Sequence, residues 1–475
     1  MNKWMKSWIW WATGTGISIL GTILWLQTGG TNESLTWFAD MMTKALTIFL
    51  VYLAGSILVS ERVWNSWYLL WEVVQEVYLN VGNMAELHLI GKISKKMRER
   101  LQRICFLLLF LLMIVMDVKS SARYGNVGRY WALAYGILLF LIAFFSVEEK
   151  LEKQNWNGKI TMLYTVFWGM TCVSDAIVRK TFSFTGYVML LAAGFVFFVW
   201  QNQHQTDMML RKILRGLEDT LPFIVLYCVC FRPIKDGGGY HGCFTNREGM
   251  ALYAVALVAA FLAELYNDEK GRDVCRSICG LAVSWYFLIA AGKKGCIVIG
   301  AALTGCMLLM YICKNKKIDL TFILLSTLIA AILIGGLHIG LQKLPQKVGH
   351  PVTYEREQET SITEDKWNRQ ELWSAYGTEW NVMGHKNALK FDGKRENASN
   401  GIMQVGYRYG ILILIPYIML LYQAYREAIK KRDVVSVMIM SVFLATMMLY
   451  NVEIPFTTPI WLMFYIFIGK EFENK

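Results

Sequence analysis

Long apolar runs alternate with short polar segments along almost the whole chain of 475 residues. Several runs approach the roughly 20 residues that an α-helix needs to cross a bilayer. Because backbone groups cannot stay unpaired in lipid, the repeated runs predict an all-α polytopic membrane protein with about 12–14 spans. The predicted spans lie near residues 8–26, 41–59, 104–118, 130–147, 160–177, 184–200, 217–231, 249–266, 276–291, 294–313, 318–341, 402–424, 434–450 and 455–469.

One long polar passage, at residues 343–400, interrupts the second half of this pattern. It divides the chain into an N-terminal bundle at 1–240, a core at 241–342, the loop itself and C-terminal helices at 401–475. A membrane protein with one large aromatic and cationic loop is expected to do its work there. The side chains in question are Arg356, Lys366, Trp367, Arg369, Trp373, Trp380, His385, Lys386, Lys394 and Arg395.

Composition and charge agree with this class. The chain is 55% hydrophobic, against about 45–50% apolar residues in soluble domains. The net charge of +12 would suit nucleic acid, but with both termini in the cytoplasm the largest basic clusters fall on inner segments, as the positive-inside rule requires. These clusters are Lys95, Lys96, Arg98, Arg100 and Arg103, then Lys314, Lys316 and Lys317, then Lys430, Lys431 and Arg432.

This orientation predicts a cell-membrane protein whose large loop is extracytoplasmic. The basic segments are expected to contact membrane lipids, and no nucleic acid is expected as a partner. The first apolar run has no A-x-A-like site after it, which indicates a retained span rather than a signal peptide. On the inner side, the apolar residues of segment 60–103 recur at helical spacing and predict an amphipathic connector on the lipid surface. They include Trp64, Trp67, Leu70, Trp71 and Val74.

No cofactor or metal motif is recognisable. The ten cysteines contain no C-x-x-C pair and lie mostly in apolar runs, so neither a zinc site nor a disulfide framework is expected. The six histidines lack H-x-x-H and H-x-x-x-H spacing. No Walker-type loop occurs, and the spacing of Gly14, Gly16 and Gly21 suits helix packing.

Three outer segments carry candidate chemistry. The first is the turn before the run at 249–266, where three glycines at 237–239 precede Asn246 and Arg247. Successive glycines let backbone amides converge on an anion. The alternative is a flexible turn that Asn246 caps.

The second segment is the tight turn Gly292-Lys293-Lys294-Gly295. A charge at membrane depth costs about 2.5–3.5 kcal/mol on insertion scales and is usually tied to function. We therefore favour an anion site over two lysines that extend to the outer headgroups.

The third segment runs from Arg369 through Trp373, Trp380 and His385 to Asn400, just before a strongly apolar run. Amides at the start of that helix suit an anion, and cations beside aromatic rings suit sugars and phosphates. The alternatives are a surface ion pair for Arg369 and an aromatic patch that rests on the membrane interface.

The order of these segments resembles the O-antigen ligase and surface polysaccharide polymerase family, over roughly residues 240–425. The family has a Gly-aromatic-small-Asn element, for which Gly242-Cys243-Phe244-Thr245-Asn246 stands here. Its Ser-Arg-Gly turn corresponds to Lys293-Lys294-Gly295, and its loop arginine to Arg369 before Leu372-Trp373. Its His-Asn pair, nine residues and a glycine correspond to Ser399-Asn400 and Gly410. Each motif is degenerate, and their joint order carries the resemblance.

Two positions depart from the family. Lys294 replaces the turn arginine, which keeps the charge but loses the bidentate fork. Ser399 replaces the histidine and does not act as a general base near neutral pH, so His385, Asp392 or Glu396 is a candidate substitute. The resemblance implies a membrane glycosyltransferase of the C type, with a polyprenyl-diphosphate-linked glycan as donor and an acceptor glycan or glycolipid.

On this hypothesis Arg247, Lys293, Lys294 and Arg369 bind the diphosphate, Trp373, Trp380 and Asn400 bind glycan, and His385 or Ser399 assists the acceptor. A first alternative is a lipid-linked oligosaccharide flippase or other transporter, which would need polar side chains along a path through the spans. The candidates for that path are Asp117, Asp175, Glu218, Asp219 and Glu264. A second alternative is a non-catalytic membrane scaffold whose loop binds a partner.

Overall fold

The computed structural model describes residues 93–119, 134–139, 141–142, 145, 158–175, 178, 206–234, 239–244, 246–267, 271–313, 320–348, 369–387, 389–391, 394–395, 398–450 and 459–471. The predicted spans at 8–26, 41–59 and 184–200 lie outside these ranges, as do residues 60–92 of the inner connector and the candidate bases Asp392 and Glu396.

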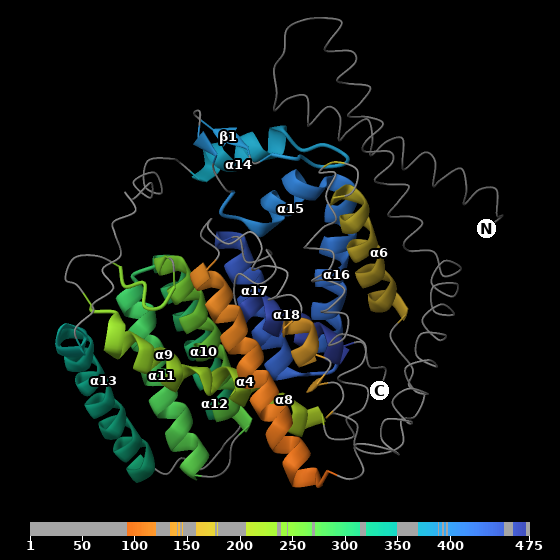
Figure 1. The fold of residues 1–475 in the computed structure, drawn as a ribbon. Coiled ribbons are helices and arrows are strands. Elements are labelled where there is room, and N and C mark those ends of the chain that lie inside the picture. Colours follow the sequence, from red (N-terminus) through yellow and green to blue (C-terminus); the bar gives the residue numbers. More distant parts are fainter. Residues whose placement is uncertain are drawn as a thin grey trace, which may run out of the picture. The chain divides into compact units, whose positions relative to one another are not determined.

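The regular elements of the described residues are helices apart from one short antiparallel strand pair, which confirms the all-α class (Figure 1). Within the described ranges, four helical segments are long and apolar enough to cross a membrane: Arg247–Asn267, Asp273–Ala291, Leu325–Pro345 and Ile411–Lys430. The elements are α4 (Lys95–Lys119), α6 (Gly158–Ser174), α8 (Thr206–Glu218), α9 (Thr220–Phe231), α10 (Arg247–Asn267), α11 (Gly271–Ala291), α12 (Lys294–Cys313), α13 (Leu320–Val348), α14 (Arg369–Thr378), β1 (Lys390–Phe391), β2 (Lys394–Arg395), α15 (Gly401–Tyr409), α16 (Ile411–Lys430), α17 (Val434–Leu449) and α18 (Pro459–Glu471).

The chain forms two compact units. The first unit comprises residues 1–75, 156–187 and 360–426, and the second comprises residues 76–155, 188–359 and 427–475. The first unit therefore holds α6, α14, β1, β2, α15 and most of α16. The second holds α4, α8–α13, α17 and α18.

Helix α10 is the centre of the second unit, packed against α8, α11, α12, α17 and α18. Its side chains from Gly249 to Glu264 are all buried, and many of them are alanine. Small residues let helix backbones approach closely, which favours helix association in lipid. Gly280 of α11 shows how close the approach is, because a methyl group built there would lie 2.2 Å from Cζ of Phe261.

Helix α13 lies at one edge of the second unit (Figure 1). Large apolar side chains along it are exposed, among them Leu328, Ile332 and Ile339. A row of exposed apolar side chains on a helix of this length is what contact with lipid tails requires. The helix continues through Pro345 to Val348, so the first six residues of the predicted loop at 343–400 are helical.

The predicted single span at 402–424 is wrong in one respect, because the chain forms two helices there. The amphipathic helix α15 ends at Tyr409, and α16 begins at Ile411. Gly410 between them has φ +95° and ψ 165°, a conformation that is essentially limited to glycine. The apolar run is continuous in sequence, but the helix is not.

The predicted span at 217–231 also differs from the structure. Helix α9 has 12 residues, too few to cross a bilayer on its own. The amphipathic helix α8 precedes it, with a buried face formed by Met209, Leu210, Ile213, Leu214 and Leu217. By contrast, α12 begins and ends at the predicted residues 294 and 313.

Candidate functional site

In the second unit, the segment after α9 pairs with the ends of two other helices. The amide of Tyr240 donates to the carbonyl oxygen of Ala290 at 2.8 Å, and the amide of Ile234 donates to that of Leu341 at 3.3 Å. The Tyr240 hydroxyl donates to the carbonyl oxygen of Arg232 at 2.9 Å, and its ring stacks on Phe287. Tyr240, which follows the three glycines, is therefore fixed against the end of α11.

Arg247 begins α10 at this same place. Oδ1 of Asn246 accepts a hydrogen bond from the Gly249 amide at 2.7 Å, so Asn246 caps the helix. The Arg247 stem runs past Gly239, where an added methyl group would lie 2.9 Å from Cδ of Arg247 and 2.7 Å from O of Ala291. The capped-turn alternative and the proximity of Arg247 to the end of α11 are both seen.

The lysine turn follows α11 directly. Gly292 adopts φ +68°, which glycine takes without strain. The carbonyl oxygen of Lys293 accepts from the Ile297 amide at 3.1 Å, and Lys294 is the first residue of α12. A methyl group built on Gly295 would lie 2.9 Å from Cδ1 of Leu449, so the start of α12 packs closely on α17.

Two of the three predicted segments thus adjoin in the second unit, and their charges are mostly positive. Lys293 and Glu248 are both close enough to Cys296 for their charges to act on its thiol. The carboxylate of Glu248 therefore belongs to the same cluster. Helices α10 and α12 both begin here, and each begins with a basic residue, Arg247 or Lys294. A helix N-terminus already carries roughly half a positive charge, so these cations add to a positive potential that suits an anion.

In the first unit, two tryptophans hold the loop onto α15. Nε1 of Trp373 donates to the carbonyl oxygen of Ala398 at 2.9 Å. Nε1 of Trp380 donates to the carbonyl oxygen of Met403 at 3.3 Å. The Trp380 ring packs on Gly406, where an added methyl group would lie 2.6 Å from Cε2 of the ring. Both rings are partly buried, and their binding of glycan stays a prediction.

Asn400 is the N-cap of α15. Its buried side chain accepts hydrogen bonds from the amides of Ile402 at 3.0 Å and Met403 at 3.2 Å. These two amides are therefore satisfied within the protein, and the start of α15 offers less to an anion than the sequence indicates. Ser399 beside it has φ +47°, an uncommon conformation for serine.

His385 lies on a short segment, residues 381–385, that we name the His385 strap. Its amide donates to the carbonyl oxygen of Tyr407 at 3.0 Å, and its ring stacks on Tyr407 with 4.3 Å between ring centroids. Nε2 of His385 lies 2.6 Å from the carbonyl oxygen of Glu379, which only accepts, and 3.1 Å from Nδ2 of Asn381, which only donates. A proton on Nε2 suits the first contact and a lone pair there suits the second, so these contacts hold the ring in place without selecting one neutral tautomer.

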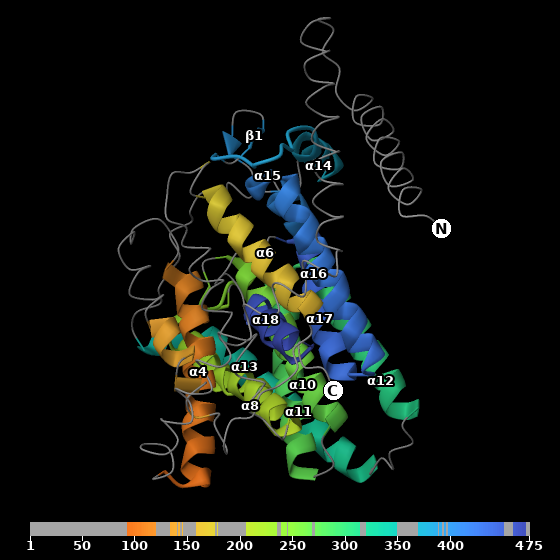
Figure 2. The same ribbon diagram turned by 90° about the vertical axis from the view of Figure 1, so that its right-hand side faces the viewer.

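The strap is held by its own turn and by α6. Oδ1 of Asn381 accepts from the Gly384 amide, and Nδ2 donates to the Gly384 carbonyl oxygen at 3.2 Å. Oγ of Ser174 donates to the carbonyl oxygen of Met383 at 2.9 Å. Helix α6 lies beside α16 in this unit (Figure 2), where Phe167 stacks on Tyr417.

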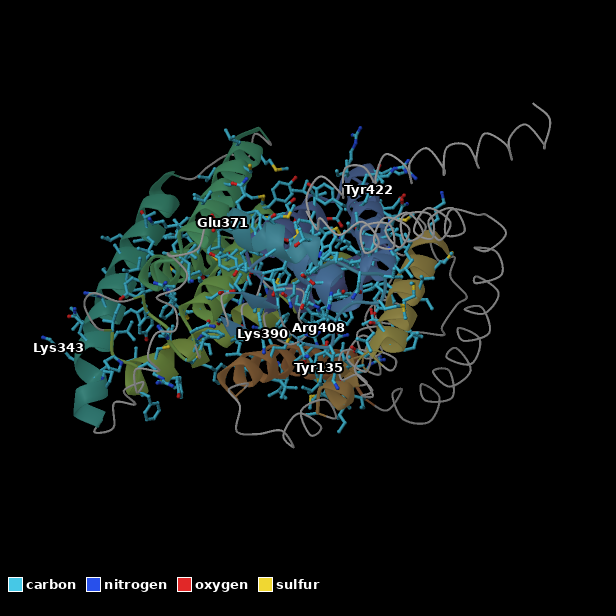
Figure 3. The ribbon with its side chains drawn as sticks, turned by 90° about the horizontal axis from the view of Figure 1, so that it is seen from above. Tyr135, Lys343, Glu371, Lys390, Arg408 and Tyr422 are labelled. Atoms are coloured by element: carbon cyan, nitrogen blue, oxygen red, sulfur yellow. The ribbon has the colours of Figure 1, made fainter. Side chains whose placement is uncertain are left out.

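The strap crosses the junction of α15 and α16 at two glycines. Gly384 has φ +81°, and a methyl group on it would lie 2.3 Å from O of Arg408. A methyl group on Gly410 would lie 2.2 Å from O of Val382. Arg408, whose guanidinium lies 5.4 Å from the Tyr409 ring centroid, and Lys390 of β1 add positive charge to this unit (Figure 3).

The predicted site residues are therefore divided between the units. Arg247, Lys293 and Lys294 lie in the second, whereas Arg369, Trp373, Trp380, His385, Ser399 and Asn400 lie in the first. Arg369 begins α14, and the structure does not describe its side chain. That the cations of both units bind one diphosphate stays a prediction. Sequence reasoning missed Tyr407 and Asn381, although the Asn-x-x-Gly spacing of 381–384 is a turn signal.

A second charged cluster lies within the second unit, where α4, α8, α10 and α11 meet. The acids in this cluster are Glu218, Asp219 and Glu264, which the sequence places in or near predicted spans. They pair with three arginines, Arg103, Arg215 and Arg276. In the part of the chain that the structure describes, no three His, Cys, Asp or Glu side chains gather as metal ligands.

Comparison with known proteins adds no assignment. No protein-family model matches the chain, and no curated protein matches it.

Proposed function

We propose that this protein transfers a glycosyl group from a polyprenyl-diphosphate-linked glycan to an acceptor glycan or glycolipid, as in polymerisation or ligation of a surface polysaccharide. The observation that supports this most is the proximity of Arg247, at the start of α10, to the end of α11, which directly precedes the Lys293-Lys294 turn. The order of motifs that resembles the ligase and polymerase family is the second support.

The proposed reaction is a displacement at the anomeric carbon of the donor. The acceptor hydroxyl oxygen forms a bond to that carbon, while the bond from the carbon to the phosphate oxygen breaks and its electron pair leaves with the diphosphate. Negative charge on the departing oxygen grows in the transition state. Cations fixed near it, here Arg247, Lys293 and Lys294, stabilise that state more than the ground state.

The acceptor hydroxyl must lose a proton in this reaction. Under the proposal His385 takes it on its imidazole ring. The ring is well positioned for a base, since stacking on Tyr407 and the backbone bond to Tyr407 hold it in one orientation. A general base of this kind usually contributes about 10²–10⁴-fold in rate.

The direct test is purified protein given a polyprenyl-diphosphate-linked glycan and analysed by gel. We expect the glycan to leave the polyprenyl diphosphate and to appear on the acceptor. A ladder indicates a polymerase, and one discrete product indicates a ligase. Unchanged donor in the presence of acceptor contradicts the proposal.

A transporter of lipid-linked oligosaccharide is the second candidate, and the buried glutamates Glu218 and Glu264, which pair with partly exposed arginines, favour it. Buried ionisable groups within membrane helices often mark a path for ions or substrates. Vesicles that contain the protein and a labelled donor separate the two. Transport moves the donor to the other leaflet without lengthening the glycan, whereas transfer lengthens it.

A further inference from the structure

Four acids and three arginines meet where α8 ends and α9 begins. Nη2 of Arg276 lies 2.9 Å from Oε2 of Glu218 and 3.2 Å from Oδ1 of Asp219. Nε of Arg215 donates to Oε1 of Glu264 at 2.8 Å. The remaining pairs join Nη2 of Arg103 to Oδ2 of Asp219 at 2.6 Å and Nη2 of Arg215 to Oδ1 of Asp273 at 3.6 Å.

Each glutamate in this network uses one oxygen and leaves the other buried. Oε2 of Glu218 and Oε1 of Glu264 accept from arginines. Oε1 of Glu218 and Oε2 of Glu264 are buried with no hydrogen-bond partner among the described residues. The charge of Glu264 also acts on Glu218, so the two carboxyl groups are close neighbours, and both side chains are almost fully buried.

Two ionised carboxylates this close would repel each other. A carboxylate oxygen only accepts, so neither glutamate satisfies the other while both are charged. One proton removes the repulsion and lets one carboxyl group donate an O–H···O hydrogen bond to the other. Like-charged carboxyls this close do not both ionise easily.

The charge balance of the network points the same way. Glu218, Asp219, Glu264 and Asp273 carry four negative charges when ionised. Arg103 on α4, Arg215 on α8 and Arg276 on α11 carry three positive charges, so one added proton makes the set neutral. A metal ion fits poorly, because guanidinium groups contact both glutamates.

We propose that Glu218 and Glu264 form a proton-binding site, in which the two carboxyl groups share one proton at neutral pH between the flanking arginines. Because Glu264 is near the end of α10 and Arg247 begins it, about 25 Å of helix separates this site from the candidate anion site. The inference therefore stands independently of the glycosyl-transfer proposal.

Infrared difference spectroscopy of the purified protein in lipid tests the proposal. The wild-type protein is expected to show the carbonyl stretch of a protonated carboxyl at neutral pH, with a shift in D₂O. Glu218→Gln and Glu264→Gln should each lose that contribution, because the remaining glutamate then ionises beside its own arginine. Glu427→Gln, which removes an acid outside this network whose ion pair is with Lys430, should keep it.

A wild-type spectrum without a protonated carboxyl overturns the proposal. So does a spectrum in which either glutamine variant keeps the full band, because the proton is then not shared by the pair. Thermal unfolding followed for each variant shows whether it is folded. Should one single variant fail to fold, the double variant Glu218→Gln with Glu264→Gln, which leaves an amide pair in place of the carboxyls, provides the same comparison.

Discussion

Replacement of Lys294 with alanine is expected to lower the rate of glycosyl transfer about 100-fold or more, the usual effect of removing one group that stabilises developing negative charge. Lys294 starts α12, next to the turn that adjoins Arg247. A positive residue at a helix N-terminus does not stabilise the helix. The alanine variant should therefore fold at least as well as the wild type while its kcat falls.

Lys294→Arg is the informative companion to this variant. The family that the motif order resembles has arginine at the corresponding turn position, so under the proposal Lys294→Arg should keep most of the activity. Lys430→Ala serves as a control, because Lys430 is a highly exposed lysine of the same unit whose ion pair joins it only to Glu427. Equal activity of Lys294→Ala and wild type in a steady-state assay would remove the lysine turn from the proposed site.

Replacement of Gly410 with alanine is expected to destabilise the first unit by about 3 kcal/mol or more, because two costs add. The residue would have to hold φ +95° and ψ 165°, which a side chain disfavours. Its Cβ would also lie 2.2 Å from the carbonyl oxygen of Val382, which is backbone and has little room to move. The His385 strap should detach from the α15–α16 junction, and transfer activity should fall with it.

Gly377→Ala is the matched control for Gly410→Ala. It lies in α14 of the same unit, and nothing lies within 4 Å of an added Cβ. Alanine favours a helix over glycine by about 1 kcal/mol, so this variant should melt at the wild-type temperature or slightly above. A Gly410→Ala protein with an unchanged melting temperature in detergent would show that the strap crossing does not constrain the unit.

The sequence predicts helix boundaries well where a local signal marks them. Helix α12 begins after the Gly292 turn, and α17 begins after Asp433, whose side chain accepts from the Ser436 amide at 3.2 Å. Both signals lie within a few residues of the boundary. Helix α8 was missed although its apolar residues recur at i, i+4 and i+8, because the polar residues between them resemble a connector.

Features that depend on distant contacts were not predictable in this way. The break at Gly410 exists because the strap at 381–385 crosses there. The number of apolar residues over 402–424 does not reveal this break. The pairing of Glu218 with Glu264 likewise needs the packing of α8 on α10. Separately, each acid is only a polar residue near the end of an apolar run.

The candidate site was predictable in its residue types but not in its arrangement. Motif order indicated Arg247, Lys293 and Lys294, and their proximity follows from the hydrogen bond between Tyr240 and Ala290. The roles of Trp373 and Trp380 in holding α15 could not be read from their spacing, because an indole ring beside cations suits both packing and sugar binding.

Whether the cationic turn binds diphosphate is measured by the affinity of the purified protein for polyprenyl diphosphate, compared with that for the same polyprenol without phosphate. We expect the diphosphate to bind at least 10-fold more tightly. The double variant Arg247→Ala with Lys294→Ala is expected to lose this difference while its melting temperature is preserved. Equal affinity for the two lipids, or a preference that survives in the double variant, would contradict the proposal.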